Sequence, residues 1–308
     1  GNRITGHITY TGGVPTDTFK VWLIKFNPAD SSLTGLDSTF SCLVGGTTPY
    51  YEFAGVSAGN YLVKAKLLSA VAGTSGYMPT YGLSTTHWDT AAPMVHTSST
   101  DSMHINMVYG TVPAGPGFIG GYISSGAGKG TSGEVPAVDM IVYLMDGANN
   151  LLTYTYTDGL GNYSFPGLAY GSYIVHPSDY KYRTTPSALI NLSSTTPSVS
   201  AINFKQRTTY GIIVPVGTLA NIPVKTNELR VYPNPVAGDN IYIYWDNVSK
   251  GVATVTITDV AGRELYQSVM DINTGSNSKV NVPGITPGIY LISITTANGS
   301  YRSKLEIE

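Results

Sequence analysis

Few residues of this chain stand at the spacing that catalysis requires. Its five histidines are isolated from one another, at positions 7, 87, 96, 104 and 176, and we expect them at the surface or at the rims of sheets. The sequence contains neither an H-E-x-x-H zinc motif nor a G-x-x-x-x-G-K-[ST] phosphate loop. Cys42 is the only cysteine, which excludes an internal disulfide and a cysteine-based zinc cluster. We therefore predict that the protein is not an enzyme.

Oxygen ligands suggest one cofactor, calcium. Asp158 and Asn162 flank a glycine-rich turn, where side-chain oxygens could hold Ca²⁺. A complete site would need further carboxylates, and Asp139 and Asp146 could reach it only through the fold. The alternative is that Asp158 hydrogen-bonds to the backbone of its own turn. No other cofactor is expected.

Aromatic side chains suggest a glycan site. Tyr77, Tyr81 and Trp88 lie in one loop-rich segment, and exposed rings there could stack on sugars. The alternative is that Tyr81 and Trp88 pack against the nearest β-sandwich.

The overall composition excludes several partners and favours strands. Lys and Arg number 17 against 19 Asp and Glu, a net charge of −2, so neither a nucleic-acid-binding face nor a polybasic membrane patch is expected. No apolar run approaches the length of a transmembrane segment. Charged residues make up only 12 %, which leaves little charge repulsion against self-association. Short alternating runs, 35 glycines and 18 prolines predict an all-β protein with many tight turns.

One strand-turn-strand phrase occurs twice. The stretch from Tyr51 to Tyr61 and the stretch from Tyr163 to Tyr173 share Tyr, Phe, Gly, an aliphatic residue, Gly and Tyr at identical spacing. Such a repeat predicts two copies of one β-sandwich module. Within 61–67 the apolar residues alternate, which places Lys64 and Lys66 together on the opposite face of a strand.

The second copy resembles a known group of surface modules. Residues 157–165 read T-D-G-L-G-N-Y-S-F, which is similar to the T-D-x-x-G-x-Y-x-F signature of carboxypeptidase-regulatory-like, SdrD B-like and Cna-B modules. The resemblance covers 116–208 and, more loosely, 3–68. It implies Ig-like or prealbumin-like antiparallel sandwiches.

The C-terminal part carries four ordered motifs. They are Tyr232-Pro233-Asn234-Pro235, the pair Gly262-Arg263, a Pro-Gly-Ile-Tyr phrase with Gly288 and Tyr290, and an ending with Lys304. In order and spacing they resemble the type A C-terminal sorting domain of the type IX secretion system of Bacteroidetes. The resemblance implies export by the type IX secretion machinery to the outer-membrane surface or the medium. It also implies that the domain is normally removed on secretion. We expect that a signal peptide has already been cleaved.

The sequence thus predicts three tandem β-sandwich domains. The expected boundaries are 1–110, 116–208 and 227–308, with 209–226 as a linker or docking arm. The expected function is that of a secreted or cell-surface structural or adhesive protein. Two alternatives remain open: a self-assembling subunit of an extracellular fibre, and a carbohydrate-binding accessory protein.

Overall fold

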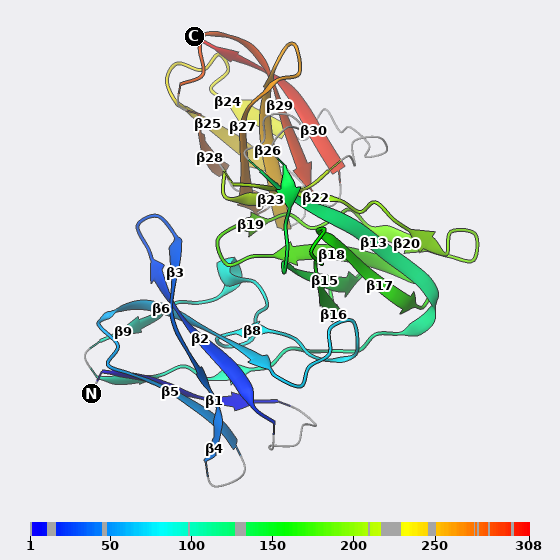
Figure 1. Cartoon of the computed structure of the whole chain (residues 1–308). Helices are drawn as coiled ribbons and strands as arrows, with labels where there is room; N and C mark the ends of the chain where they lie inside the picture. The colour runs from blue at the N-terminus through cyan, green and yellow to red at the C-terminus, as the bar shows by residue number, and fades with distance from the viewer. Residues whose placement is uncertain are drawn as a thin grey trace.

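The computed structural model describes most of the chain, and its regular structure is almost entirely strand. The described residues are 2–10, 17–44, 48–97, 99–126, 134–208, 210–216, 229–245, 251–273, 275, 277–282, 284–296 and 299–308. Within them, the single helical turn is η1 (Trp88–Thr90). The prediction of an all-β fold is confirmed. Three large hydrophobic clusters follow one another along the chain, and the two termini lie at opposite ends of the molecule (Figure 1).

We call the strands around the first cluster the N-terminal module. They are β1 (Arg3–Thr9), β2 (Phe19–Asn27), β3 (Ser32–Phe40), β4 (Cys42–Val44), β5 (Thr48–Ala54), β6 (Gly59–Leu67), β7 (Gly76–Tyr77), β8 (Thr80–Tyr81), β9 (Met94–His96), β10 (Thr100–Ser102), β11 (Ile105–Asn106) and β12 (Tyr109–Gly110). One sheet has the order β3-β2-β6-β8 and the other β10-β1-β5-β4. Tyr61 and Val63 of β6 enter the core between these sheets, whereas Lys64 and Lys66 lie on the outer face, as predicted.

The central module surrounds the second cluster. Its strands are β13 (Ala114–Gly126), β14 (Val135–Pro136), β15 (Ile141–Asp146), β16 (Leu151–Tyr156), β17 (Asn162–Leu168), β18 (Gly171–Ser178), β19 (Arg183–Thr184), β20 (Ile190–Leu192), β21 (Ser198–Val199), β22 (Phe204–Arg207) and β23 (Ile212–Pro215). One sheet has the order β14-β13-β22-β23-β19 and the other β16-β15-β18-β20. β15 is buried along almost its whole length, because the N-terminal module covers its outer face.

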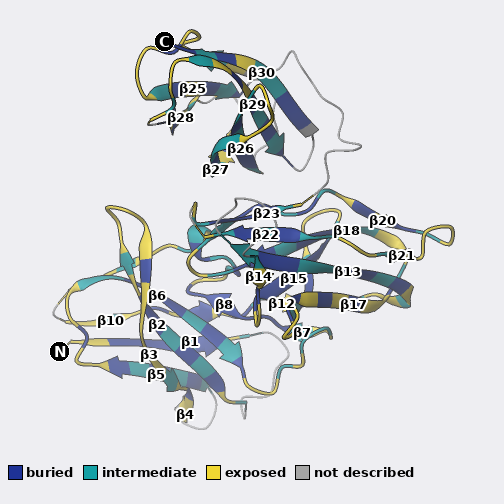
Figure 2. Ribbon diagram, turned by 45° about the horizontal axis from the view of Figure 1, so that its top comes forward, coloured by how far each residue is buried: buried dark blue, intermediate teal, exposed yellow. Residues whose placement is uncertain are grey.

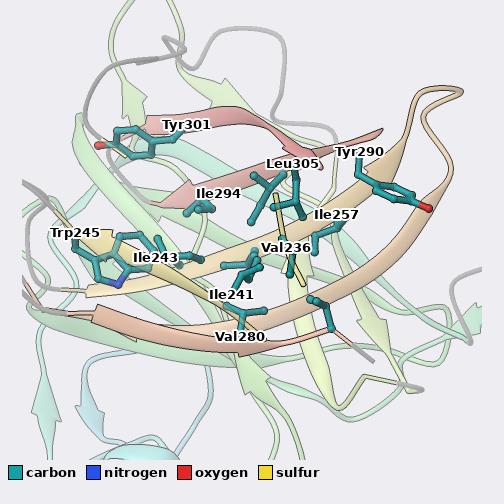
Figure 3. Packing of buried hydrophobic residues seen from close by; sticks show 14 of the residues in the cluster. Val236, Ile241, Ile243, Trp245, Ile257, Val280, Tyr290, Ile294, Tyr301 and Leu305 are labelled. Atoms are coloured by element: carbon teal, nitrogen blue, oxygen red, sulfur yellow. The ribbon is translucent and has the colours of Figure 1, made fainter. Parts of the chain in front are cut away.

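The C-terminal module consists of two facing sheets. Its strands are β24 (Leu229–Tyr232), β25 (Asn240–Trp245), β26 (Gly251–Asp259), β27 (Glu264–Ile272), β28 (Asn277–Asn281), β29 (Gly288–Thr296) and β30 (Gly299–Ile307). The sheets have the orders β24-β25-β28 and β27-β26-β29-β30. Their inner faces bury Trp245, Ile257 and Leu305 (Figure 3). Buried residues alternate with exposed ones along most of these strands, as expected for a two-layer sandwich (Figure 2).

The same corner occurs in all three modules. In each, a glycine with positive φ stands six residues before a tyrosine whose hydroxyl donates to the carbonyl oxygen four residues earlier, at 2.8, 2.8 and 2.6 Å in chain order. The pairs are Gly55 and Tyr61, Gly167 and Tyr173, and Gly284 and Tyr290, with glycine φ of 71°, 73° and 73°. A residue with a Cβ is strained at such φ values. The corner carries the chain from one sheet to the other in each module, from β5 to β6, β17 to β18 and β28 to β29.

Segment 209–226, predicted to be a linker or docking arm, is only partly within the described residues. Its described part, 210–216, contains β23, which pairs antiparallel with β22 and parallel with β19. This part is therefore an internal strand of the central module. The reason is its apolar content, because Ile212, Ile213 and Val214 are all buried.

The N-terminal and central modules share a continuous junction. Met78 and Tyr143 belong to one apolar cluster that crosses the boundary, and the Tyr143 hydroxyl donates to the carbonyl oxygen of Pro79 at 3.0 Å. The Trp88 indole N–H donates to the carbonyl oxygen of Tyr182 at 2.9 Å. These contacts set the two modules side by side and create the cleft described below.

Candidate functional site: the motif-bearing end of the C-terminal module

The four C-terminal motifs, separate in sequence, meet at one end of the C-terminal module. Asp259, Tyr290 and Leu305 lie in register on the adjacent strands β26, β29 and β30. Val236, which directly follows the first motif, forms a bridge with Ile307 of β30. The fold therefore brings the beginning, middle and end of the module to one place.

Asn234 joins the first motif to the last. Its side-chain Nδ2 donates to the carbonyl oxygen of Lys304 at 2.8 Å, and its Oδ1 accepts from the backbone N–H of Glu306 at 2.9 Å. Backbone bonds continue the contact, because Val236 N–H donates to the carbonyl oxygen of Glu306 and Glu308 N–H donates to that of Val236. Asn234 can supply both bonds because an amide is at once donor and acceptor.

The second motif is a tight turn closed by Asp259. The Asp259 carboxylate accepts from the backbone N–H groups of Ala261 and Arg263, at 3.0 and 2.9 Å, and from the Arg263 Nε–H at 3.0 Å. The backbone N–H bond from Arg263 is the main cause that lowers the pKa of Asp259 below its usual range. Gly262 has φ of +81°, a conformation that favours glycine.

The motif residues divide into a buried and an exposed set. Tyr290, Leu305 and Ile307 belong to the hydrophobic core. Arg263 and Lys304 are exposed, and so are four apolar side chains of the motifs or of residues beside them in sequence: Tyr232, Val260, Ile289 and Leu291. On the outer face of β29 and β30, Ile289 lies opposite Glu306 and Leu291 lies opposite Lys304. The motif-bearing end thus presents an apolar surface with charges beside it.

The other strands of that sheet contact the central module. Arg207 forms an ion pair with Glu264 at 2.7 Å, and Arg183 forms one with Asp271 at 2.7 Å. The hydroxyls of Thr185 and Thr254, both buried, are 2.8 Å apart. The same interface contains an apolar cluster, formed by Ile212 and Val214 of the central module and Val269 of the C-terminal module. The C-terminal module is therefore packed against the rest of the chain.

The three aromatic residues expected at a glycan site are buried. Tyr77 is 9 %, Tyr81 0 % and Trp88 8 % exposed. The Tyr77 ring packs against Tyr109 with the ring centroids 5.0 Å apart. Because all three side chains are buried, the expectation of an exposed sugar platform is wrong. The cause is packing against the N-terminal sandwich, the alternative given above: Tyr77 belongs to its core, and Tyr81 and Trp88 share a cluster with Leu62. The Trp88 indole N–H is in addition bonded to the central module.

The side chains of Asp158 and Asn162 form hydrogen bonds within their own turn. One carboxylate oxygen of Asp158 accepts from the backbone N–H groups of Leu160 and Asn162, at 2.9 and 2.8 Å. These backbone bonds lower the pKa of Asp158. In the described part of the chain, no three His, Cys, Asp or Glu residues are grouped as metal ligands.

A motif that the sequence reasoning missed is Gly55-Val-Ser-Ala-Gly59, which has the G-x-S-x-G spacing of a hydrolase nucleophile elbow. Such an elbow connects a strand to a helix, but this segment connects β5 to β6. His96 lies close by and is buried, contrary to expectation. Its Nδ1 is 2.6 Å from Oδ2 of Asp101, and its Nε2 is 3.1 Å from the carbonyl oxygen of Val56. Both ring nitrogens thus lie within hydrogen-bond distance of an oxygen of the surrounding strands and loops, and His96 is part of a structural corner.

Comparison with known protein families supports the resemblance of the C-terminal motifs to a sorting domain. Residues 230–308 match the family model of a secretion system C-terminal sorting domain. The chain therefore carries a type IX sorting signal and is exported to the cell surface or the extracellular space. No helix among the described residues is both long and apolar enough to cross a membrane. A search of curated proteins found no match.

Several solved structures share some similarity with the chain. The Bacillus anthracis TIE protein is 13 % identical with a TM-score of 0.22, and the match covers 100 % of this chain and 48 % of that protein. The minor pilin GBS52 of Streptococcus agalactiae is 10 % identical with a TM-score of 0.24, covering 73 % and 100 %. A streptococcal ancillary pilin is 9 % identical with a TM-score of 0.21, covering 100 % and 97 %. The chain thus spans about half the length of the TIE protein. At such TM-scores no function is transferred.

Proposed function

We propose that the chain is a non-catalytic structural or adhesive protein of the cell surface. Its N-terminal and central modules are the exported cargo, and its C-terminal module is the address recognised by the type IX secretion machinery. The observation that supports the address role of the C-terminal module is the meeting of four separate motifs at one end of it.

The buried and exposed motif residues have different roles in this proposal. Tyr290 and Leu305 stabilise the sandwich from inside. Ile289 and Leu291 project from the same strand to the outside, where they are 52 % and 38 % exposed. An exposed apolar patch beside charged groups is typical of a protein-docking surface. The secretion machinery binds this surface.

The test is export of a double variant, Ile289→Ser with Leu291→Ser, in a bacterium with a type IX system. The variant should keep its fold, because both side chains point away from the core, and should accumulate inside the cell envelope. The matched control is Leu160→Ser, an exposed leucine of the central module that is 69 % exposed. Export of the double variant at the level of the control would show that the secretion machinery does not bind this surface.

A second candidate function is that of a fibre subunit. The packing of the C-terminal module against the central module favours it, because a module that is only an address has no need for buried contacts with its cargo. A fibre subunit would keep the C-terminal module and associate with further copies. Sedimentation of the exported protein over a hundredfold range of concentration, with mass spectrometry of its C-terminus, tests this function. Monomers that end before residue 229 would exclude it.

A further inference from the structure

A cleft opens between the N-terminal and central modules. Its volume is about 930 Å³, within the range of small-molecule and oligosaccharide sites. One wall is the outer face of the sheet β3-β2-β6-β8, with Trp22, Asp37, Lys64, Lys66 and Tyr81. Residues on the opposite wall include Asp139, Tyr156, Asp179, Tyr180 and Gln206. The two walls belong to different modules, so the cleft exists only in the assembled chain.

The first wall is a row of aromatic rings and ammonium groups. Trp22, Lys64 and Tyr81 lie in register across β2, β6 and β8. The Lys64 Nζ is 4.8 Å from the ring centroid of Tyr81. The Lys66 Nζ is 4.8 Å from the ring centroid of Tyr156, which comes from the central module. Cation-π contacts with these two rings therefore hold both lysines at the first wall of the cleft.

Three polar groups at this wall have no hydrogen-bond or ion-pair partner in the described part of the chain. Neither Lys64 nor Lys66 forms an ion pair or hydrogen bond with any residue that the structure describes, whereas the half-buried Arg207 and Lys205 are both paired with glutamates. The Tyr81 hydroxyl, on a side chain that is 0 % exposed, also lacks a partner in the described part of the chain. Burial lowers the pKa of Lys64 to about 8, against the opposing attraction of the Asp179 carboxylate on the facing wall. The unpaired ammonium groups of Lys64 and Lys66, which line the cleft, fit an anionic ligand.

The opposite wall restricts which anion can enter. Asp139 and Asp179 both line it, and Asp179 already accepts from Gln206 Nε2 at 3.0 Å. Together with Asp37 of the first wall, these carboxylates would repel a ligand of dense negative charge, such as a nucleic acid. They would accept hydrogen bonds from hydroxyl groups. The cleft therefore suits a ligand with isolated anionic groups, many hydroxyls and apolar ring faces.

We propose that this cleft binds an acidic oligosaccharide. Lys64 and Lys66 bind its carboxylate or sulfate group, the rings of Trp22 and Tyr180 stack on its sugar faces, and Asp139 accepts from its hydroxyls. This site differs from the exposed platform expected from the sequence, because the stacking surface is formed by Trp22 and the central module. The inference goes beyond the proposed function, since export through the C-terminal module does not depend on it.

The test is binding of the full chain to an array of uronic-acid, sialylated and sulfated oligosaccharides with their neutral counterparts, followed by titration calorimetry of the best acidic member. The acidic member should bind, its neutral counterpart should not, and the double variant Lys64→Gln with Lys66→Gln should weaken binding at least tenfold. The matched control is Lys25→Gln, an exposed lysine of β2 outside the cleft, which should bind as the parent does.

A second variant separates loss of charge from loss of fold. Lys64→Arg with Lys66→Arg keeps both charges and should bind within a few-fold of the parent. Three results would overturn the proposal: no acidic oligosaccharide binds, the neutral counterpart binds equally well, or the double glutamine variant binds unchanged. Preferential binding of a glutamate tripeptide would also overturn it, because the cleft would then be a peptide site.

Discussion

Replacing Asn234 by alanine should loosen the last strand of the C-terminal module. The change removes both side-chain hydrogen bonds that connect the first sorting motif to β30, one to the carbonyl oxygen of Lys304 and one from the N–H of Glu306. A hydrogen bond contributes about 0.5 to 1.5 kcal/mol net, so the local loss is about 1 to 3 kcal/mol. Since 1.4 kcal/mol corresponds to a factor of ten, local opening should become about 5- to 150-fold more frequent.

Hydrogen exchange of the full chain measures this opening directly. Peptides that contain the amides of Glu306 and Glu308 should exchange faster in Asn234→Ala by that factor, whereas peptides of the N-terminal module should be unchanged. The control is Lys304→Ala, because Asn234 contacts only the backbone of Lys304 and the lost ion pair with Glu306 is solvent-exposed. Equal exchange in Asn234→Ala and the parent, or an equal acceleration in the control, would refute the idea that this side chain fastens the motifs together.

Three further predictions concern the module boundaries. His87 and His176 stack with ring centroids 4.0 Å apart, and burial lowers the pKa of both, that of His176 to about 4. Between pH 4 and 6.5 the unfolded chain therefore binds more protons than the folded chain. The melting temperature should fall as the pH is lowered from 7 to 5, and this fall should be smaller in His87→Phe. Val269→Asp puts a carboxylate into the apolar contact with Ile212 and should release the C-terminal module from the central module. Small-angle scattering should then give a larger radius of gyration. An unchanged radius would argue against a packed interface. Because the pKa of Lys64 is about 8, binding of an acidic oligosaccharide in the cleft should weaken between pH 7 and 9, and calorimetry of Lys64→Arg should show no such loss.

Local patterns in the sequence predicted the strands well. The alternation at 61–67 placed Tyr61 inside and Lys64 outside, because side chains of a strand point to its two faces in turn. The repeated phrase predicted two equivalent corners. The third corner, which ends at Tyr290, escaped notice because Val282 stands where the other copies have phenylalanine, although Gly284 and Gly288 keep the spacing.

Contacts between modules could not be predicted in this way. Trp88 is separated by 94 residues from its hydrogen-bond partner Tyr182, so nothing near it in sequence indicates that it is covered. The same packing turns the outer face with Lys64 into the wall of a cleft, although the sequence alone makes it an ordinary polar face. Four motifs of the sorting domain could be recognised from sequence, but their meeting at one end depends on strand register.

Transfer of the C-terminal module to a reporter tests the central claim most directly. Residues 217–308 would be fused behind a signal peptide and a monomeric fluorescent protein, and the reporter outside the cells would be quantified in strains with and without a working type IX system. The account predicts that the reporter leaves the cell envelope only where the system works, and that the fusion with Ile289→Ser and Leu291→Ser stays inside. A parent fusion that remains in the periplasm of the competent strain, while a native type IX substrate is exported normally, would contradict it.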